Sequence, residues 1–208
     1  GEFHVTAMNW SPDSARIAFE RQPTPKADDW AKMDISEVAV ADGAVKAIAA
    51  TAAAESDPVY SPDGRHLAYS RSRTLPRWAT ERRIVVRTGE AERELPSTFD
   101  EQPRIFAWSP DSRRIFFAEG NRAKLVIYAM PLDGPAAVVA QAAEGTFGAV
   151  DINTTGTHLG LARQSPNQAP EAFVVEARAG ASPVQVSRAN AHLPAFPAAK
   201  TETIRWKS

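Results

Sequence analysis

Apolar and polar residues alternate along short stretches of this chain, and several of these stretches end in a proline-containing turn. One stretch covers residues 104–108; Ser109, Pro110 and Asp111 follow it, and a second alternating stretch begins at Ile115. An alternation with a period of two residues is typical of β-strands. Proline presets the first turn angle, and aspartate can accept hydrogen bonds from backbone amides two residues on. The pattern therefore predicts a strand, a tight turn and a second strand.

This pattern is repeated along the chain. WSPDSARIAF begins at Trp10, YSPDGRHLAY at Tyr60 and WSPDSRRIFF at Trp108, so that successive copies are 50 and 48 residues apart. A weaker fourth copy begins 44 residues later at Ile152, where the apolar positions remain but the proline and the aspartate are missing. Periods of this length predict the blades of a β-propeller.

Each repeat is expected to contain four strands. Third strands are predicted at residues 35–40, 84–87, 125–129 and 172–176, and fourth strands at residues 45–49, 93–95, 138–140 and 184–187. We expect an all-β fold, a partial β-propeller of about four four-stranded blades. The predicted units are residues 3–50, 51–98, 99–145 and 146–187, with residues 188–208 as a link and strand toward a missing domain.

Two alanine-rich segments conflict with this scheme. Residues 44–55 and 135–144 would be helical on intrinsic propensity alone. The corresponding positions of the other repeats, near Arg93 and Val184, have the pattern of strands. We therefore predict strands in both segments.

Composition and charge narrow the classes of function. The chain has 24 Lys and Arg residues against 25 Asp and Glu residues, so it lacks the broad positive field that binding to nucleic acid phosphates requires. It has no cysteine, which excludes disulfides, thiolate catalysis and cysteine-bound zinc. No apolar stretch approaches the roughly 18 residues of a membrane span. The compartment, whether cytoplasmic, periplasmic or secreted, stays open.

The chain offers no evident catalytic or metal-binding group. No serine has the G-x-S-x-G context of a hydrolase nucleophile, and the repeated turns account for Ser11, Ser61 and Ser109. His66 and His158 occupy the same repeat position, and the other two histidines lie in terminal segments without a second ligand at a suitable spacing. We expect no catalytic residue, metal or cofactor in this chain.

The W-S-P-D-(S/G)-x-x-I-x-F unit resembles the blades of TolB-like proteins and, more closely, the N-terminal propellers of prolyl-oligopeptidase-type serine peptidases. Dipeptidyl and acylaminoacyl peptidases of that family share three features with this chain: Phe99 and Asp100 before a repeat, an insertion with a tryptophan at Trp30, and a tail ending in Trp206, Lys207 and Ser208. The resemblance covers nearly all of the chain. It implies a propeller truncated before its α/β-hydrolase domain, which would carry the catalytic residues.

Binding residues are expected on one face of the propeller. If the strands alternate in direction, the loops at residues 21–33, 71–83 and 164–171 share a face with the blade crossings at residues 55–57 and 99–102. Long loops on a rigid scaffold are where binding residues concentrate. The Arg82 and Arg83 pair is expected at an exposed strand edge.

The resemblance also implies candidate substrate contacts on this face. An acidic pair would bind the amino terminus of a peptide and an arginine its carbonyl oxygen. The nearest equivalents are Asp100 and Glu101 for the acids, Arg71 or Arg73 for the arginine, and Trp30 and Trp78 as walls of the pocket. The alternative is structural: these carboxylates cap a turn, the arginines are solvated, and the tryptophans cover the blade surface.

The sequence thus favours a noncatalytic propeller domain that gates or orients peptide substrates for an absent α/β-hydrolase domain of the same polypeptide. A TolB-like propeller that binds a protein partner is the main alternative. A polysaccharide-acting propeller would need clustered histidines or carboxylates, and here the histidines are dispersed. An open array would expose strands near Val5 and Ile204, which predicts self-association or an unusual closure between the termini.

Overall fold

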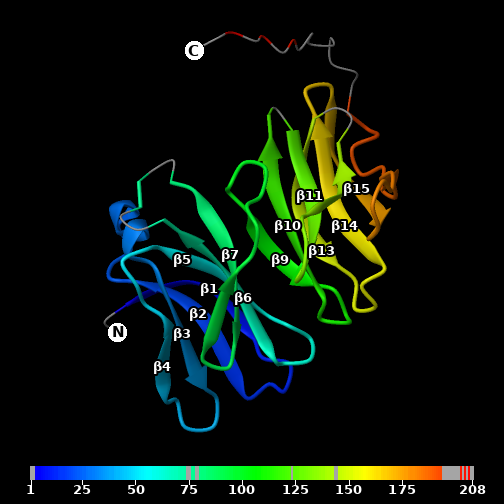
Figure 1. Ribbon diagram of the computed structural model, residues 1–208. Helices are drawn as coiled ribbons and strands as arrows, with labels where there is room; N and C mark the ends of the chain where they lie inside the picture. Colours follow the sequence, from blue (N-terminus) through cyan, green and yellow to red (C-terminus); the bar gives the residue numbers. More distant parts are fainter. Residues whose placement is uncertain are drawn as a thin grey trace.

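Four separate antiparallel sheets of four strands each make up the chain (Figure 1). The computed structural model describes residues 3–73, 76–77, 80–122, 124–142 and 145–193, together with residues 202, 204 and 206. Within each sheet the strands follow one another in space in their order along the chain. The predicted all-β, propeller-like fold is confirmed.

We refer to the four sheets as blades 1 to 4. Blade 1 contains β1 (His4–Trp10), β2 (Arg16–Gln22), β3 (Asp34–Ala39) and β4 (Val45–Ala49), and blade 2 contains β5 (Glu55–Tyr60), β6 (His66–Ser72), β7 (Arg82–Thr88) and β8 (Ala91–Glu94). Blade 3 contains β9 (Arg104–Trp108), β10 (Arg114–Asn121), β11 (Lys124–Pro131) and β12 (Ala137–Gln141), and blade 4 contains β13 (Thr146–Ile152), β14 (His158–Ser165), β15 (Gln168–Glu176) and β16 (Val184–Gln185).

The two alanine-rich segments form strands β4 and β12, as predicted. β4 pairs with β3 and β12 pairs with β11, so the backbone hydrogen bonds of both segments are made within a sheet. Ala49 and Ala140 are buried against the neighbouring blade. Sheet pairing and burial outweigh the small intrinsic preference of alanine for helix.

The turns between the first and second strands have the same hydrogen bonds in each full repeat. In blade 3, Ser109 Oγ donates to Asp111 Oδ1 at 2.5 Å and accepts from the backbone N–H of Arg114 at 2.9 Å. Asp111 Oδ1 also accepts from the backbone N–H of Arg113 at 3.2 Å. The repeated serines and aspartates therefore stabilise turns.

The residue after the aspartate of each turn has a left-handed backbone conformation. The fourth repeat lacks the aspartate and uses a different side chain. The φ angle at this position is 58° at Ser14 and 69° at Gly64, in the left-handed region that glycine adopts readily. In blade 4, Asn153 Oδ1 accepts from the backbone N–H groups of Thr157 at 2.9 Å and His158 at 3.0 Å. Asn153, at the position of the repeat serine, thus accepts the two backbone hydrogen bonds that serine and aspartate share in the other turns.

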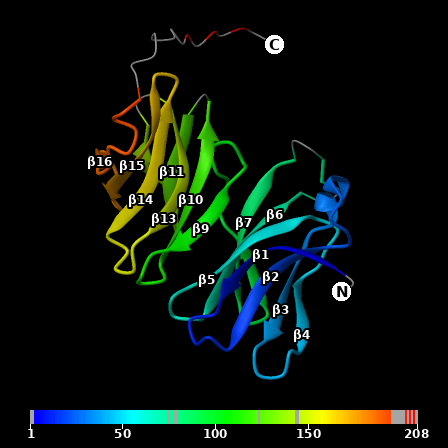
Figure 2. The same cartoon turned by 180° about the vertical axis from the view of Figure 1, so that it is seen from behind.

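The blades pack face to face, and the core consists of the three interfaces between neighbours (Figure 2). The first strands contact one another in the order β1, β5, β9 and β13. Between blades 1 and 2, Ala18 and Ile35 face the larger Tyr60, Leu67 and Tyr69. Because side chains alternate across a strand, every blade contributes apolar side chains on both faces.

The outer face of blade 1 has no neighbouring blade to cover it. Trp10 is 52% exposed, whereas its repeat equivalents Tyr60 and Trp108 are 8% and 4% exposed. Blades 1 and 4 stand at opposite ends of the array in both views. Val5, on β1, is 44% exposed, and Ile204 is 75% exposed and lies outside any strand. The apolar surface left open is therefore mainly a sheet face.

Loop lengths differ between the blades. The β2–β3 connection is long and contains a 3-10 helix, η1 (Ala27–Lys32), and the β6–β7 connection is also long. The prediction of a long loop at residues 164–171 is wrong, because Ser165 pairs directly with Gln168 in a tight hairpin. Blade 3 has a similar hairpin, in which Asn121 pairs with Lys124. Among the described residues, no helix is long and apolar enough to cross a bilayer.

The packing predicts unequal costs for two equivalent tryptophans. Trp108→Ala should lower the free energy of unfolding by about 3–5 kcal/mol, because it empties a buried site and removes the hydrogen bond from the indole N–H to Val59 O (2.9 Å). Trp10→Ala should cost about 1 kcal/mol or less, because this ring is already half exposed. Urea unfolding of both variants measures the difference. Equal losses would show that the exposed face of blade 1 is covered in solution.

Candidate functional site

Three segments meet on the face opposite the Ser-Pro-Asp turns, which we call the loop face. They are the β2–β3 connection, the β6–β7 connection and the crossing from β8 to β9. A hollow of about 160 Å³ lies between them, lined by Trp30, Arg77, Thr80, Arg82 and Gln102. We call it the loop-face hollow.

Trp30 is held in place by the folding of η1. Asp29, the buried residue of this helix, accepts hydrogen bonds from Thr24 Oγ1 at 2.5 Å and from Lys32 Nζ at 2.8 Å. The bond from Lys32 and then that from Thr24 hold the pKa of Asp29 below its ordinary value. The charged Asp29 side chain thus stabilises η1, and this helix carries Trp30, one wall of the loop-face hollow.

Hydrogen bonds brace the other walls. Gln102 Nε2 donates to the backbone carbonyl of Thr80 at 2.6 Å, and the backbone N–H of Gln102 donates to Glu119 Oε1 at 2.9 Å. Arg82 Nη1 donates to Ser56 Oγ at 2.6 Å. Segments from blades 2 and 3 are therefore tied together around the loop-face hollow.

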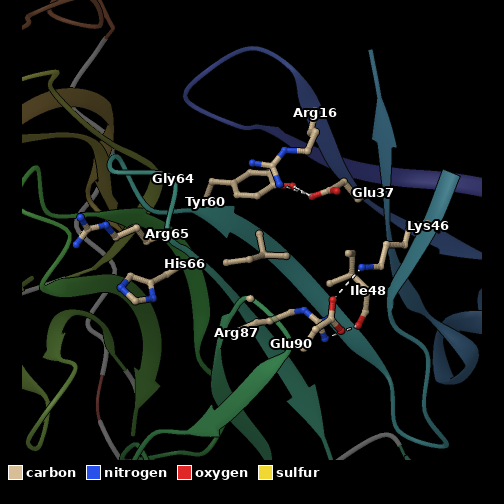
Figure 3. Close-up of a pocket in the computed structure, with 12 residues that line it drawn as sticks. Arg16, Glu37, Lys46, Ile48, Tyr60, Gly64, Arg65, His66, Arg87 and Glu90 are labelled. Atoms are coloured by element: carbon tan, nitrogen blue, oxygen red, sulfur yellow. Dashed lines mark hydrogen bonds and ion pairs between the residues drawn. The ribbon is translucent and has the colours of Figure 1, made fainter. Parts of the chain in front are cut away.

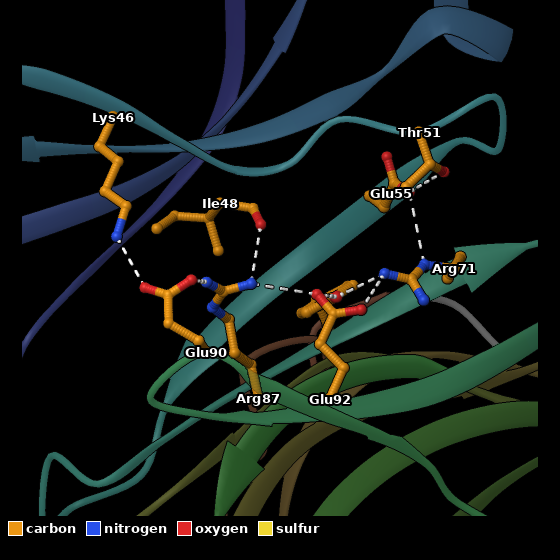
Figure 4. A network of polar contacts seen from close by, with 9 residues as sticks. Lys46, Ile48, Thr51, Glu55, Arg71, Arg87, Glu90 and Glu92 are labelled. Atoms are coloured by element: carbon orange, nitrogen blue, oxygen red, sulfur yellow. Dashed lines mark hydrogen bonds and ion pairs between the residues drawn. The ribbon is translucent and has the colours of Figure 1, made fainter.

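Arg71, a predicted substrate contact, lies in a polar network between strands (Figure 4). Its Nη2 contacts Glu92 Oε2 at 2.6 Å and Tyr69 Oη at 2.7 Å, and its Nε lies 3.4 Å from Glu55 Oε1. Glu55 is fully buried, and burial raises its pKa despite the hydrogen bond from Thr51 and the charge of Arg71. Arg71 therefore compensates a buried carboxylate.

The other predicted residues are dispersed. Arg73 Nε pairs with Glu81 Oε2 at 3.2 Å on the surface. Glu101 Oε1 pairs with Arg83 Nη2 at 2.8 Å, whereas the Asp100 carboxylate lies against Gly120. Glu101 is thus already paired with a cation of the same chain. Of the predicted set, Trp30 lines the loop-face hollow, and Trp78 lies outside the described residues.

Sequence reasoning missed Arg77, Thr80, Arg82 and Gln102. Arg82 was expected at an exposed strand edge, but it is half-buried and lines the loop-face hollow. The available signal was the alternation of β7, which places Arg82 on the same face as the buried Ile84.

At the bulge of β5, an aspartate has its backbone in the left-handed region. Asp57 has a φ of 55°, and its backbone N–H donates to Glu20 Oε1 at 2.6 Å, while Thr6 Oγ1 donates to Glu20 Oε2 at 2.6 Å. Burial, followed by the charge of Glu20, raises the pKa of Asp57 to about 6 against the opposing charges of Arg104 and Arg82. No group of three metal-ligating side chains occurs among the described residues.

A second hollow, of about 250 Å³, opens between blades 1 and 2 on the face of the Ser-Pro-Asp turns (Figure 3). Its charged groups largely satisfy one another. The Tyr60 hydroxyl donates to Glu37 Oε2, and Glu90 binds both Lys46 Nζ at 2.9 Å and Arg87 Nη2 at 2.7 Å. These contacts brace blade 1 against blade 2.

Comparisons with known proteins place this geometry among peptidase and TolB propellers. No protein-family model matches the chain. Dipeptidyl-peptidase 5 of Trichophyton equinum is 29% identical over 84 residues, which is 38% of this chain and 11% of the relative. The chain thus spans about a tenth of the length of the curated relatives it matches.

Two solved structures share the fold. A TolB-type protein of Agrobacterium tumefaciens superimposes with a TM-score of 0.70 at 17% identity, covering 90% of this chain and 63% of that one. A puromycin-hydrolyzing peptidase of Mycobacterium tuberculosis gives a TM-score of 0.65 at 14% identity, covering 92% and 30%. The predicted resemblance to the propeller portion of a prolyl-oligopeptidase-type peptidase is confirmed.

Arg71 and Arg73 should differ in their effect on stability. Arg71→Gln should lower the free energy of unfolding by about 3 kcal/mol or more, because it leaves the buried Glu55 without its cation. Arg73→Gln should cost about 1 kcal/mol or less, because an exposed ion pair contributes little. Urea unfolding tests both, and Glu55→Gln in the Arg71→Gln background should recover part of the loss. A neutral effect of Arg71→Gln would contradict the structural role.

Asp57 should make stability fall as pH rises. Its folded pKa of about 6 exceeds its ordinary value of 3.8, so folding takes up a proton between these values and stability is lost as pH rises through this window. Asp57→Asn should therefore raise the free energy of unfolding at pH 7, by up to about 3 kcal/mol, with little effect at pH 4. Asparagine also tolerates a positive φ.

Asp111→Asn provides the control for the pH experiment. The hydrogen bond from Ser109, above all, lowers the pKa of Asp111. This stability contribution is present at neutral pH and is lost as pH falls through the folded pKa, so Asp111→Asn should destabilise at pH 7. Thermal unfolding from below pH 3.8, where the Asp111 contribution is lost, up to pH 8 measures both variants. Parallel curves for wild type and Asp57→Asn would contradict the raised pKa.

Proposed function

We propose that this chain is the noncatalytic propeller portion of a serine peptidase, and that its loop face orients peptide substrates for an α/β-hydrolase domain elsewhere in the polypeptide. The observation that carries the proposal is the loop-face hollow, which combines an anchored tryptophan with guanidinium and amide groups on a braced scaffold. Aromatic surface with a few placed polar groups is suited to peptide side chains and backbone.

The small size of the loop-face hollow supports a site that this chain shares with a second domain. Complete small-molecule pockets usually enclose about 300–1,000 Å³, whereas this hollow measures about 160 Å³. It has room for one or two residues of a peptide. A second surface placed over the loop face would complete the pocket.

The path of the chain after blade 4 also agrees with a domain over the loop face. Glu171, beside the β14–β15 hairpin, accepts hydrogen bonds from the backbone N–H groups of Ala189 at 3.0 Å and Asn190 at 2.8 Å. Asn190 Nδ2 donates to Pro170 O at 2.6 Å. Residues 187–190 therefore leave blade 4 on the same face as the loop-face hollow.

A TolB-like propeller that binds a protein partner is the second candidate. The TM-score of 0.70 to a TolB-type protein favours it, although at 17% identity this likeness concerns the fold. The reading frame after Ser208 separates the two candidates. An α/β-hydrolase pattern with a G-x-S-x-G motif supports the peptidase, and a stop codon there supports the binding module.

The proposed function predicts that Trp30 contributes to peptide affinity. Trp30→Ala should weaken binding of short peptides to the chain by about tenfold, because a buried aromatic contact typically dominates such an interface. Trp10→Ala is the matched control, since it removes a tryptophan on the outer face of blade 1. NMR titration with a neutral tetrapeptide measures the affinities.

The same samples test the absence of catalysis. We expect no hydrolysis of peptide or ester substrates and no labelling by a serine-directed fluorophosphonate. Stoichiometric labelling of any serine would overturn the noncatalytic role, and peptide affinity unchanged by Trp30→Ala would move the binding site elsewhere.

A further inference from the structure

The arginines of blade 2 fall into two groups. Arg71, Arg83 and Arg87 all have carboxylate partners within 3 Å. Arg82 has no ion pair within the described residues, where its guanidinium donates a hydrogen bond to Ser56 Oγ. Burial lowers the pKa of Arg82, which reflects the cost of keeping this cation away from water.

The alternation of side chains along β7 explains why Arg82 differs from the paired arginines. Arg83, Val85 and Arg87 point to one face of the strand, whereas Arg82 points to the same side as Ile84, which is buried between blades 2 and 3. Arg82 therefore stands at the end of an apolar interface. A guanidinium has five N–H donors, and among the described residues the bond to Ser56 uses one of them.

A second cation lies at the same hollow. Arg77 is exposed, lines the loop-face hollow beside Trp30 and Arg82, and has no ion pair within the described parts of the chain. Among the described residues that line the hollow, none carries a carboxylate. Asp57 and Glu20 influence the charge of Arg82 from beyond ion-pair distance.

We propose that the loop-face hollow binds a carboxylate group of a peptide, with Arg82 as the hydrogen-bonding cation, Arg77 as a second cation at the rim and Trp30 as the apolar wall. The proposal deepens the proposed function and rests on it. A guanidinium and a carboxylate match in a bidentate geometry, and such charge-assisted bonds are stronger than neutral ones.

Two observations narrow the chemical class of the ligand. Glu101, one of the two acids that were candidates for an ammonium site, is already paired with Arg83. The negative charges of Asp57 and Glu20 near Arg82 would oppose a dianion such as a phosphate more than a monoanion. A single carboxylate, from a side chain or from the peptide terminus, is therefore the favoured group.

The test uses the 208-residue chain and four peptides that differ in one group. The reference is acetyl-Ala-Ala-Phe-Ala-amide; the others carry a free C-terminal carboxylate, a glutamate in place of the second alanine, or a phosphoserine at that position. NMR titration at low salt should give at least tenfold tighter binding for one or both carboxylate peptides than for the neutral reference. The tighter of the two identifies the source of the carboxylate.

Variants assign the effect to the site. Arg82→Gln should abolish the carboxylate preference, and Arg82→Lys should retain a weaker one because it keeps the charge without the planar fork. Arg77→Gln should reduce the preference about threefold and leaves the folded core untouched, so it tests the site even if Arg82→Gln unfolds. Arg65→Gln is the matched control: Arg65 also lacks an ion pair among the described residues, but it belongs to the turn face.

The outcomes separate the two proposals. Equal affinity for neutral and carboxylate peptides, or a preference that Arg82→Lys and Arg77→Gln leave unchanged, overturns carboxylate recognition while peptide binding itself stands. Tighter binding of the phosphoserine peptide than of either carboxylate peptide overturns it as well. Failure of every peptide to bind removes the proposed function together with this inference.

Discussion

A β-sheet with apolar side chains on both faces must be covered on both faces, and this constraint governs the molecule. Side chains alternate along each strand, so every blade offers one apolar set to the blade before it and another to the blade after it. Tyr60 and Trp108 are buried because a preceding blade covers them, whereas Trp10 in the same repeat position is half exposed. The radial stack follows from this requirement.

Stacking also decides where function can lie. The Ser-Pro-Asp turns use serine and aspartate side chains to satisfy the backbone, which gives the turns of blades 1, 2 and 3 nearly the same form. The opposite ends of the strands are free to vary. Among the connections between second and third strands, those of blades 1 and 2 are long, so η1 with Trp30 and the β6–β7 connection meet the β8–β9 crossing on one side of the array and form a small, asymmetric hollow.

The fold could be predicted from the sequence because its determinants are local and repeated. The turn chemistry and the two-residue alternation fix the strands, and the repeat register correctly overruled helix propensity at β4 and β12. The site could be predicted only in part. Whether an arginine is neutralised depends on carboxylates from other strands: Arg71 meets Glu55 and Glu92, and no local pattern reveals that encounter. The η1 helix and the hairpin at Ser165 likewise depend on individual side chains and loop lengths outside the repeat.

Arg71 on β6 and Arg82 on β7 differ in how neighbouring residues compensate their charge. Burying a cation is costly unless a partner compensates it. Arg71 points to a face where Glu92 and Glu55 provide that compensation, so its charge stabilises the blade. Arg82 points to an apolar interface, where Ser56 satisfies a single donor and distant carboxylates supply only weak compensation. An anionic ligand would supply the compensation that this half-buried cation lacks among the described residues, because part of the desolvation of Arg82 has already occurred on folding.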